Sequence, residues 1–198
     1  MSLSKKEAAR VILASASPRR RELLQLLGLE FEVRPSAVEE RQLPGEPAEV
    51  FIARLAREKA EDVARRSAPI PENTVVLGAD TEVVLDGVPL GKPVDDADAA
   101  RMLGMLSGRA HDVLTGLWLI PASGQAYGGI ESTRVWFGEM SESEIAEYVA
   151  SGEPRDKAGA YAIQGLAARF IPRIEGCYYN VMGLPVAALY RLLREERI

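Results

Sequence analysis

The stretch VILASASPRRRELL, residues 11–24, decides the fold, because its pattern is that of a strand, a sharp turn and the start of a helix. Residues 11–14 form an apolar run of the length of one buried strand. Ser17 is a natural N-cap, and Pro18 suits the first helical position after it. Leucines at positions 23, 24 and 27 give the helix an apolar side, and Gly28 ends it. We therefore expect the chain to begin an α/β fold here.

The first turn of this helix carries an unusual charge. The N-terminus of a helix is the positive end of its dipole and favours acidic residues, yet Arg19, Arg20 and Arg21 stand there. A bound anion would offset the repulsion, because backbone N–H groups, the hydroxyls of Ser15 and Ser17 and the guanidinium groups could hold it. The alternative is that the arginines face water, as most charge runs do. From this stretch alone the two interpretations have equal weight.

The composition is that of an ordinary globular protein, with 198 residues, 47% hydrophobic and 27% charged. We expect one domain over residues 1–198. The net charge of -5 argues against a general nucleic-acid binder, which usually needs a basic face. One cysteine, Cys177, cannot form an internal disulfide and suits a reducing compartment. No apolar run resembles a membrane span or a signal peptide, so we expect a cytoplasmic protein without a membrane partner.

Residues 47–66 show the clearest helical pattern, with apolar residues at i, i+3 and i+4 spacing. Lys59 falls in the middle of this apolar stripe, between Ile52 and Val63. An ammonium group on a core-facing side must either snorkel to an edge or meet an anion. We favour the second alternative, a contact with a bound substrate.

Carboxylates occur at two unusual places. Residues 35–47 form a polar loop that contains Glu39 and Glu40, and loops of this length are often functional. Asp80 interrupts the apolar strand pattern of residues 74–85, where aspartate is disfavoured. If this strand runs straight, Asp80 and Glu82 share one face and could both reach a hard cation such as Mg²⁺. The alternative is a solvated edge strand.

The remaining segments predict further elements of an α/β protein. Lys92 follows a short hairpin, and a helix capped by Asp95 or Asp96 ends near Gly108. The single histidine, His111, argues against a multi-histidine metal site and a Cys/His nucleophile pair, and we expect it to be structural or to support other site residues. Ser141 and Glu144 form a capping box. We also expect strands at residues 111–120 and 125–137, a short apolar strand ending at Gln164, another strand over residues 166–175, a loop over 176–183 and a helix after Pro185.

Several segments together resemble the Maf family of nucleoside triphosphate pyrophosphatases. They keep the order of the family's motifs and cover nearly the whole chain. They are ASASPRR (14–20), LAREKA (55–60), GADT (78–81), GKP (91–93), HDVLTG (111–116), DKAGAYAIQG (156–165) and NVMGLP (180–185).

This resemblance implies an elongated mixed sheet flanked by helices, similar to the inosine triphosphate pyrophosphatase fold. It implies hydrolysis of a nucleoside triphosphate to the monophosphate and pyrophosphate, a divalent cation (Mg²⁺ or Mn²⁺) as cofactor, and a homodimer. A rival hypothesis is a regulator of septum formation that binds a nucleotide without hydrolysing it. Asp80 discriminates between them, because a carboxylate beside a polyanion does not help a pure phosphate binder.

The resemblance also assigns roles to residues. Asp80 matches the general base, and by its place on the strand face it is also a candidate metal ligand. Glu40 matches an acidic position that places a metal or water, although Glu39 is an alternative counterpart. Arg19, Thr81 and Gln164 match positions associated with base preference. The expected substrate contacts are Ser15, Arg20, Lys59, Lys92 and Lys157, to which the turn pattern adds Ser17.

The base-preference positions favour dTTP and UTP. The Gln164 amide can accept from N3–H of thymine or uracil and donate to a neighbouring carbonyl, and Arg19 and Thr81 can supply further donors. A site for guanine would more naturally offer a carboxylate, and these three positions provide none. The alternative is that Gln164 caps its strand and Arg19 is exposed.

Overall fold

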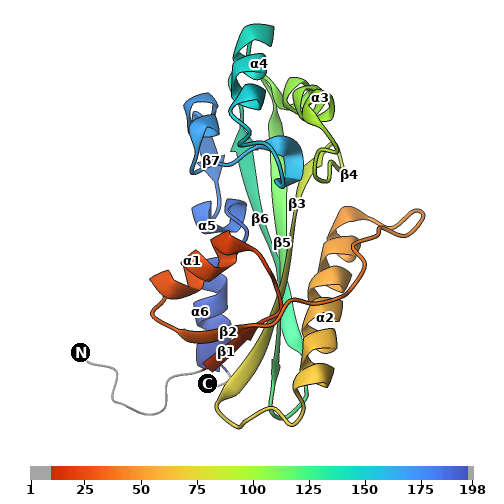
Figure 1. Ribbon diagram of the computed structural model, residues 1–198, viewed down its shortest axis with the longest axis vertical. Coiled ribbons are helices and arrows are strands. Elements are labelled where there is room, and N and C mark those ends of the chain that lie inside the picture. Colours follow the sequence, from red (N-terminus) through yellow and green to blue (C-terminus); the bar gives the residue numbers. More distant parts are fainter. Residues whose placement is uncertain (1–9, 196–198) are drawn as a thin grey trace. The chain divides into compact units, whose positions relative to one another are not determined.

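The structure, a computed structural model, describes residues 10–195. In this part of the chain one mixed sheet of seven strands has the order β2-β1-β3-β5-β6-β7, and β4 pairs with β3 (Figure 1). β1 (Arg10–Leu13) is parallel to both β2 (Glu30–Val33) and β3 (Thr74–Leu85). β4 (Val88–Pro89) runs antiparallel to β3, and β7 (Arg173–Glu175) antiparallel to β6 (Tyr127–Trp136). The expected mixed α/β sheet is confirmed.

The chain divides into two compact units. Unit 1 takes its described residues from Met1–Asp80, Thr115–Glu131 and Gly183–Ile198, and unit 2 consists of Thr81–Leu114 and Ser132–Met182. β3, β5 (Ala110–Pro121) and β6 each contribute residues to both units. No helix within residues 10–195 is both long enough and apolar enough to cross a membrane.

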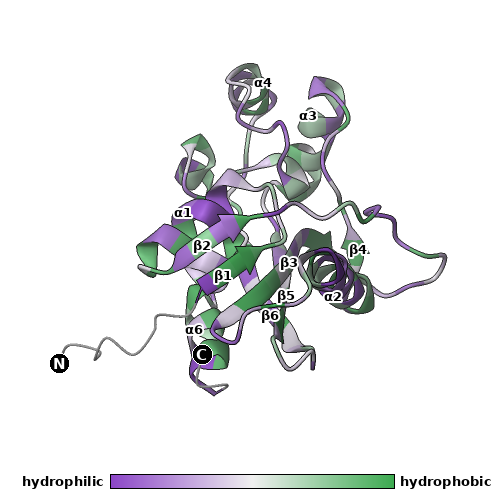
Figure 2. Cartoon of the chain, turned by 60° about the horizontal axis from the view of Figure 1, so that its bottom comes forward, coloured by the Kyte–Doolittle hydropathy of each residue, from purple (hydrophilic) through white to green (hydrophobic). Residues whose placement is uncertain are grey.

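Unit 1 contains α1 (Pro18–Leu26), α2 (Ala48–Ser67) and α6 (Val186–Glu195). Its strands β1 and β3 are largely hydrophobic, whereas α1 carries hydrophilic residues (Figure 2). Ile12 of β1, Val76 of β3 and Val63 of α2 belong to one buried apolar cluster. The apolar stripe of α2 thus packs on the central strands, as its spacing predicts.

Two glycines allow α2 to lie close to these strands. A Cβ atom added at Gly78 of β3 would fall within 3.0 Å of backbone atoms of Ala56 and Ala60. A Cβ atom at Gly116 of β5 would lie 2.6 Å from the carbonyl oxygen of Ile52. The strand surface therefore has no side chains where the helix backbone passes, and this close approach fixes the depth at which α2 sits.

Unit 2 contains α3 (Asp96–Leu106), α4 (Glu142–Ala150), α5 (Tyr178–Val181) and the 3₁₀ helices η1 (Ala158–Ala160) and η2 (Leu166–Phe170). His111 lies in its core, where Nε2 is 2.8 Å from the Tyr161 hydroxyl and the ring packs edge-on against Phe137 and Tyr161. Burial lowers the pKa of His111 to about 4. The imidazole is therefore neutral at pH 7.

The predicted local signals form as expected at several places. Ser17 caps α1, since its hydroxyl accepts from the Arg20 N–H, and Asp95 caps α3. Ser141 and Glu144 form a complete capping box at the start of α4. α2 and β3 occupy the segments that their apolar periodicities indicate.

Three predictions in the C-terminal third are wrong. The apolar segment before Gln164 is not a strand, because Gly159 and Ala160 have φ values of 65° and 59°, which no extended strand can adopt. Within residues 166–175 the helix η2 precedes the short strand β7. The expected loop over 176–183 contains helix α5, and the buried Asn180 within it donates to the Val113 carbonyl and the Thr133 hydroxyl.

Candidate functional site

The turn between β1 and α1 gathers three of the predicted substrate contacts. The Ser15 hydroxyl accepts from the Ser17 N–H at 3.2 Å and from Arg20 Nη1 at 2.9 Å. Arg20 Nε donates to the Gly183 carbonyl at 2.9 Å. Arg20 is only 8% exposed, so the interpretation that all three arginines face water is wrong, although Arg21 does.

Buried charge dominates the electrostatics of this turn. Burial lowers the pKa of the Arg20 guanidinium, and the carboxylates of Asp80 and Glu40 oppose that shift. Arginine keeps its proton in proteins, so the buried group remains a cation. The positive charge of Arg20 is thus stabilised by Asp80 and Glu40, the two carboxylates that are the candidate metal ligands.

Lys59 joins those two carboxylates. Its Nζ donates to Glu40 Oε1 and to Asp80 Oδ1, both at 2.5 Å. Lys59 is 5% exposed and does not snorkel to water. Of the two adjacent glutamates, Glu40 makes this pair. Its partner on the strand, Asp80, is also buried, at 9% exposure. A contact between Lys59 and a triphosphate stays a prediction.

Glu82 has a different role from Asp80. In unit 2 its Oε1 accepts from the backbone N–H groups of Val83 at 3.0 Å and Gly91 at 2.9 Å. This buried carboxylate therefore fixes the backbone at the start of the Gly91–Lys92–Pro93 loop. Within the described residues no group of three or more His, Cys, Asp and Glu side chains could hold a metal ion. A cation would have to be shared between few protein carboxylates and other ligands.

The other predicted residues of unit 2 lie on its loops. Lys92 and Gln164 are exposed, and Thr81 is half-buried directly after Asp80 in β3. Lys157 precedes η1, and its Nζ donates to the Arg155 carbonyl at 3.3 Å. The Gly159 N–H donates to the Gly91 carbonyl at 2.9 Å, which ties the segments of the two lysines together.

Sequence reasoning missed several groups that support these residues. The Gly183 carbonyl that receives Arg20 gives no signal in a single sequence. The ion pair of Arg54 with Glu46 joins a helix to an irregular loop, and only the i,i+4 spacing of Arg54 and Glu58 could have been found. Arg19 is half-buried on α1.

Known proteins are similar to this one, in fold or in sequence, over almost the whole chain. A protein of Staphylococcus aureus described as a Ham1 protein matches 94% of this chain and 99% of its own, with a TM-score of 0.54 and 15% identity. A Koribacter versatilis protein named dTTP/UTP pyrophosphatase is 50% identical over 95% of either chain. An Aquifex aeolicus protein of the same name is 49% identical over 94% of this chain and 95% of its own. The family model described as Maf-like protein matches residues 10–196. The chain therefore belongs to the Maf-like protein family.

Proposed function

We propose that this protein is a hydrolase that cleaves nucleoside triphosphates, preferably dTTP and UTP, to the monophosphate and pyrophosphate, and so removes unwanted nucleotides from the pool. Relatives that are about half identical over nearly the full chain carry the name dTTP/UTP pyrophosphatase. The observation that carries the proposal is the buried Lys59, paired with both Glu40 and Asp80. A protein that only binds polyanions does not benefit from two carboxylates at this place.

The proposed reaction is attack of water on the α-phosphorus. Asp80 accepts a proton from the water as the new P–O bond forms. The bond from the α-phosphorus to the bridging oxygen breaks, and pyrophosphate leaves with the electron pair. Lysines and arginines neutralise the phosphate charge that develops during such a transfer. We assign this task to Arg20, Lys59, Lys92 and Lys157, and hydrogen bonds to phosphate oxygens to Ser15 and Ser17.

The donor set fits a hard divalent cation. Glu40 and Asp80 both reach the same ammonium group, so their carboxylate oxygens lie close together. Mg²⁺ is typically held by one or two protein carboxylates, with water and substrate phosphates completing its shell. We propose that Glu40 and Asp80 would hold Mg²⁺ or Mn²⁺. When bound, the cation would neutralise charge on the triphosphate.

The decisive measurement is pyrophosphate release from a panel of nucleoside triphosphates with and without Mg²⁺. We expect release from dTTP and UTP that requires the cation and falls about 10²-fold or more in Asp80→Asn, because the general base is lost. Asp86→Asn is the matched control, because Asp86 is an exposed turn residue at the end of the same strand. Nucleotide binding without release by the wild type would support the rival regulator.

Base preference gives a second test. We propose that Gln164, with Arg19 and Thr81, recognises the thymine or uracil edge. Gln164→Glu replaces the amide donor with an acceptor and should lower kcat/KM for dTTP and UTP relative to GTP, because a site built for specific hydrogen bonds rejects a mismatched edge. The measurement is kcat/KM for dTTP, UTP, CTP, dATP and GTP. An unchanged ranking would remove Gln164 from the recognition of the base.

The resemblance also predicts a homodimer, and the single cysteine suits the cytoplasm. We propose the dimer as the state of the active enzyme. Light scattering of the purified protein at assay concentration tests it, and a monomer mass with full activity would contradict it.

A further inference from the structure

The first residues of the loop that carries Glu40 are hydrogen-bonded to helix α2. Asp62 Oδ2 accepts from the Ala37 N–H at 3.0 Å, and Arg66 Nη2 donates to the Pro35 carbonyl at 2.8 Å. Val38 packs against the buried cluster that includes Phe51 of the same helix. The first residues of the loop therefore follow the surface of α2.

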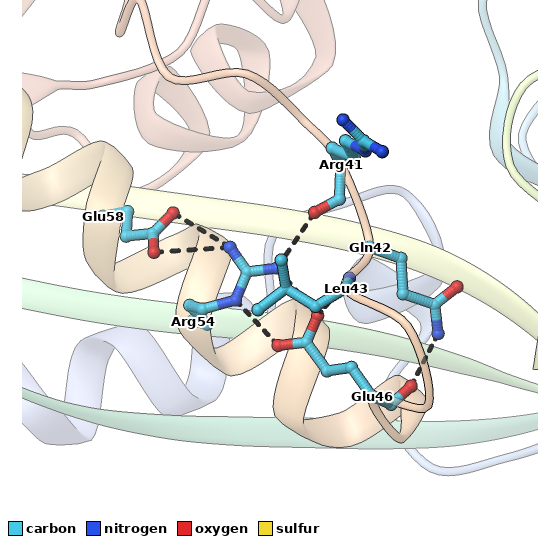
Figure 3. Close-up of polar contacts among 6 residues, drawn as sticks. All are labelled: Arg41, Gln42, Leu43, Glu46, Arg54 and Glu58. Atoms are coloured by element: carbon cyan, nitrogen blue, oxygen red, sulfur yellow. Dashed lines mark hydrogen bonds and ion pairs between the residues drawn. The ribbon is translucent and has the colours of Figure 1, made fainter.

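Arg54 ties the other end of the loop (Figure 3). Its Nε and Nη2 donate to the two carboxylate oxygens of Glu46, each at 2.7 Å. Nη2 also donates to the Arg41 carbonyl at 3.0 Å, directly after Glu40. Nη1 donates to both carboxylate oxygens of Glu58, at 3.3 and 3.1 Å. All three guanidinium nitrogens are thus used, and two of them hold the loop.

Glu46 completes the closure of this end of the loop. Its second carboxylate oxygen accepts from the Leu43 N–H at 3.0 Å, and its carbonyl accepts from the Gln42 side chain at 2.7 Å (Figure 3). The Glu46 side chain is only 6% exposed. The hydrogen bonds from Arg54, followed by the one from Leu43, lower the pKa of Glu46 to about 2. The pair is therefore charged, bidentate and largely shielded from water, unlike a typical surface ion pair.

Glu40 lies between these two attachments. Its side chain is 50% exposed, so the core does not hold it in place, yet its carboxylate meets the buried ammonium of Lys59. A carboxylate on an irregular loop can keep one position only if the loop backbone is fixed on both sides. The attachment nearest to Glu40 in the chain is the hydrogen bond from Arg54 to the carbonyl of Arg41.

We propose that Arg54 is a positioning residue: it holds the loop of residues 35–47 on α2 and so keeps the Glu40 carboxylate beside Lys59 and Asp80. Arg54 acts through Glu40 and needs no contact with the substrate. This inference rests on the proposed pyrophosphatase activity for its kinetic consequence, but its structural consequence can be measured without that activity.

A double-mutant cycle tests the proposal by kinetics. Arg54→Ala should lower kcat and raise the Mn²⁺ concentration for half-maximal activity by about 10-fold each, as typical losses of a supporting partner do. In the Glu40→Gln background the same substitution should have almost no further effect, because Arg54 acts only through Glu40. Independent losses that multiply would overturn the proposal. Arg57→Ala is the matched control, because Arg57 makes an exposed i,i+4 pair with Glu61 on the same helix and should behave as wild type.

Limited proteolysis tests it without any assay of activity. Trypsin can cut after Arg41 only when the loop leaves α2, so Arg54→Ala should speed that cleavage about 10-fold, while Arg57→Ala should not. Mass spectrometry identifies the fragment that ends at Arg41. Equal cleavage in all three proteins would overturn the proposal. If the wild type hydrolyses no nucleotide but Arg54→Ala releases the loop, the proposed function fails while the positioning role of Arg54 stands.

Discussion

Two loops carry predicted site charges, and they are held in different ways. The loop of residues 35–47, in unit 1, is fixed by charged side chains of a helix, chiefly through the Arg54–Glu46 pair. The Gly91–Lys92–Pro93 loop, in unit 2, is fixed through its backbone. Gly91 donates to the buried Glu82 carboxylate and accepts from the Gly159 N–H.

The difference concerns what each loop delivers. The first loop places a carboxylate, Glu40, whose charge is already matched by Lys59. The second fixes only the backbone, and the Lys92 side chain remains exposed. A preformed charge pair suits a chemical step that needs a fixed geometry, whereas an exposed lysine on a fixed backbone can adapt to a flexible polyphosphate.

The largest effect on activity should come from breaking the charge pair of the first loop. Lys59→Met keeps most of the apolar stem but leaves Glu40 and Asp80 without their shared cation. We expect a folded protein whose kcat/KM for dTTP falls about 10²-fold, as when one preorganised stabilising group is removed. Lys59→Arg, which keeps the charge, should lose less. Wild-type turnover in Lys59→Met would show that the ammonium has only a packing role.

The next effect is expected from acid, which should destabilise the folded protein through His111 of unit 2 at a higher pH than through Glu46 of unit 1. His111 has a folded pKa of about 4, below its unfolded value near 6.5, so the unfolded state binds more protons between these values. The free energy of unfolding should therefore decrease as pH falls from about 6.5 to 4, by up to about 3 kcal/mol. Asp112, whose charge favours the protonated imidazole, limits the loss. By contrast, the contribution of the Glu46 carboxylate is complete above about pH 4.5 and is lost progressively as the pH falls from there to its pKa of about 2.

Urea unfolding of the wild type and of His111→Gln across this pH range checks the expectation. The variant can keep a hydrogen bond to the Tyr161 hydroxyl but has no group that titrates there. Its stability should depend less on pH than that of the wild type. Parallel curves would contradict the assignment to His111.

A smaller effect is expected when the second loop loses its acceptor. Glu82→Leu leaves the N–H groups of Val83 and Gly91 without the carboxylate that they share. An unsatisfied buried N–H costs about 1–3 kcal/mol, and the Gly91 N–H is only partly buried, so the free energy of unfolding should fall by an amount near the lower end of that range. Glu82→Gln retains an acceptor oxygen and is the control. Equal stability of both variants and the wild type in urea would show that Glu82 does not hold this loop.

Local sequence signals predicted the elements of unit 1 well. The strand–turn–helix of residues 11–24 and the helix containing Lys59 depend on periodicity and capping, which are properties of neighbouring residues. The same reasoning singled out Asp80 and Lys59, because each breaks the pattern of its own element. That Lys59 would pair with Glu40 could not be predicted, since the path of an irregular loop is set by tertiary contacts.

The failures near the C-terminus have a common cause. The segment before Gln164 is apolar and short, which also describes a buried strand, but the left-handed backbone at Gly159 and Ala160 makes it a turn. The sequence around Asn180 gives no local signal for helix α5. The buried Asn180 amide holds this helix against β5 and β6. Both segments have partners remote in sequence, because the Gly159 N–H donates to the Gly91 carbonyl and Asn180 donates to Val113 and Thr133.

Gly78 and Gly116 are important for the site because they have no side chain. At these two positions no side chain separates α2 from the strands, so the helix backbone lies directly on the strand backbone. The distance between α2 and β3 in turn determines whether the Lys59 side chain can reach Asp80. In a comprehensive survey of substitutions these two positions should be as intolerant as the charged residues, although neither bears a functional group. The hydrogen atoms that replace a side chain at Gly78 and Gly116 therefore set the spacing between the helix that carries Lys59 and the strand that carries Asp80.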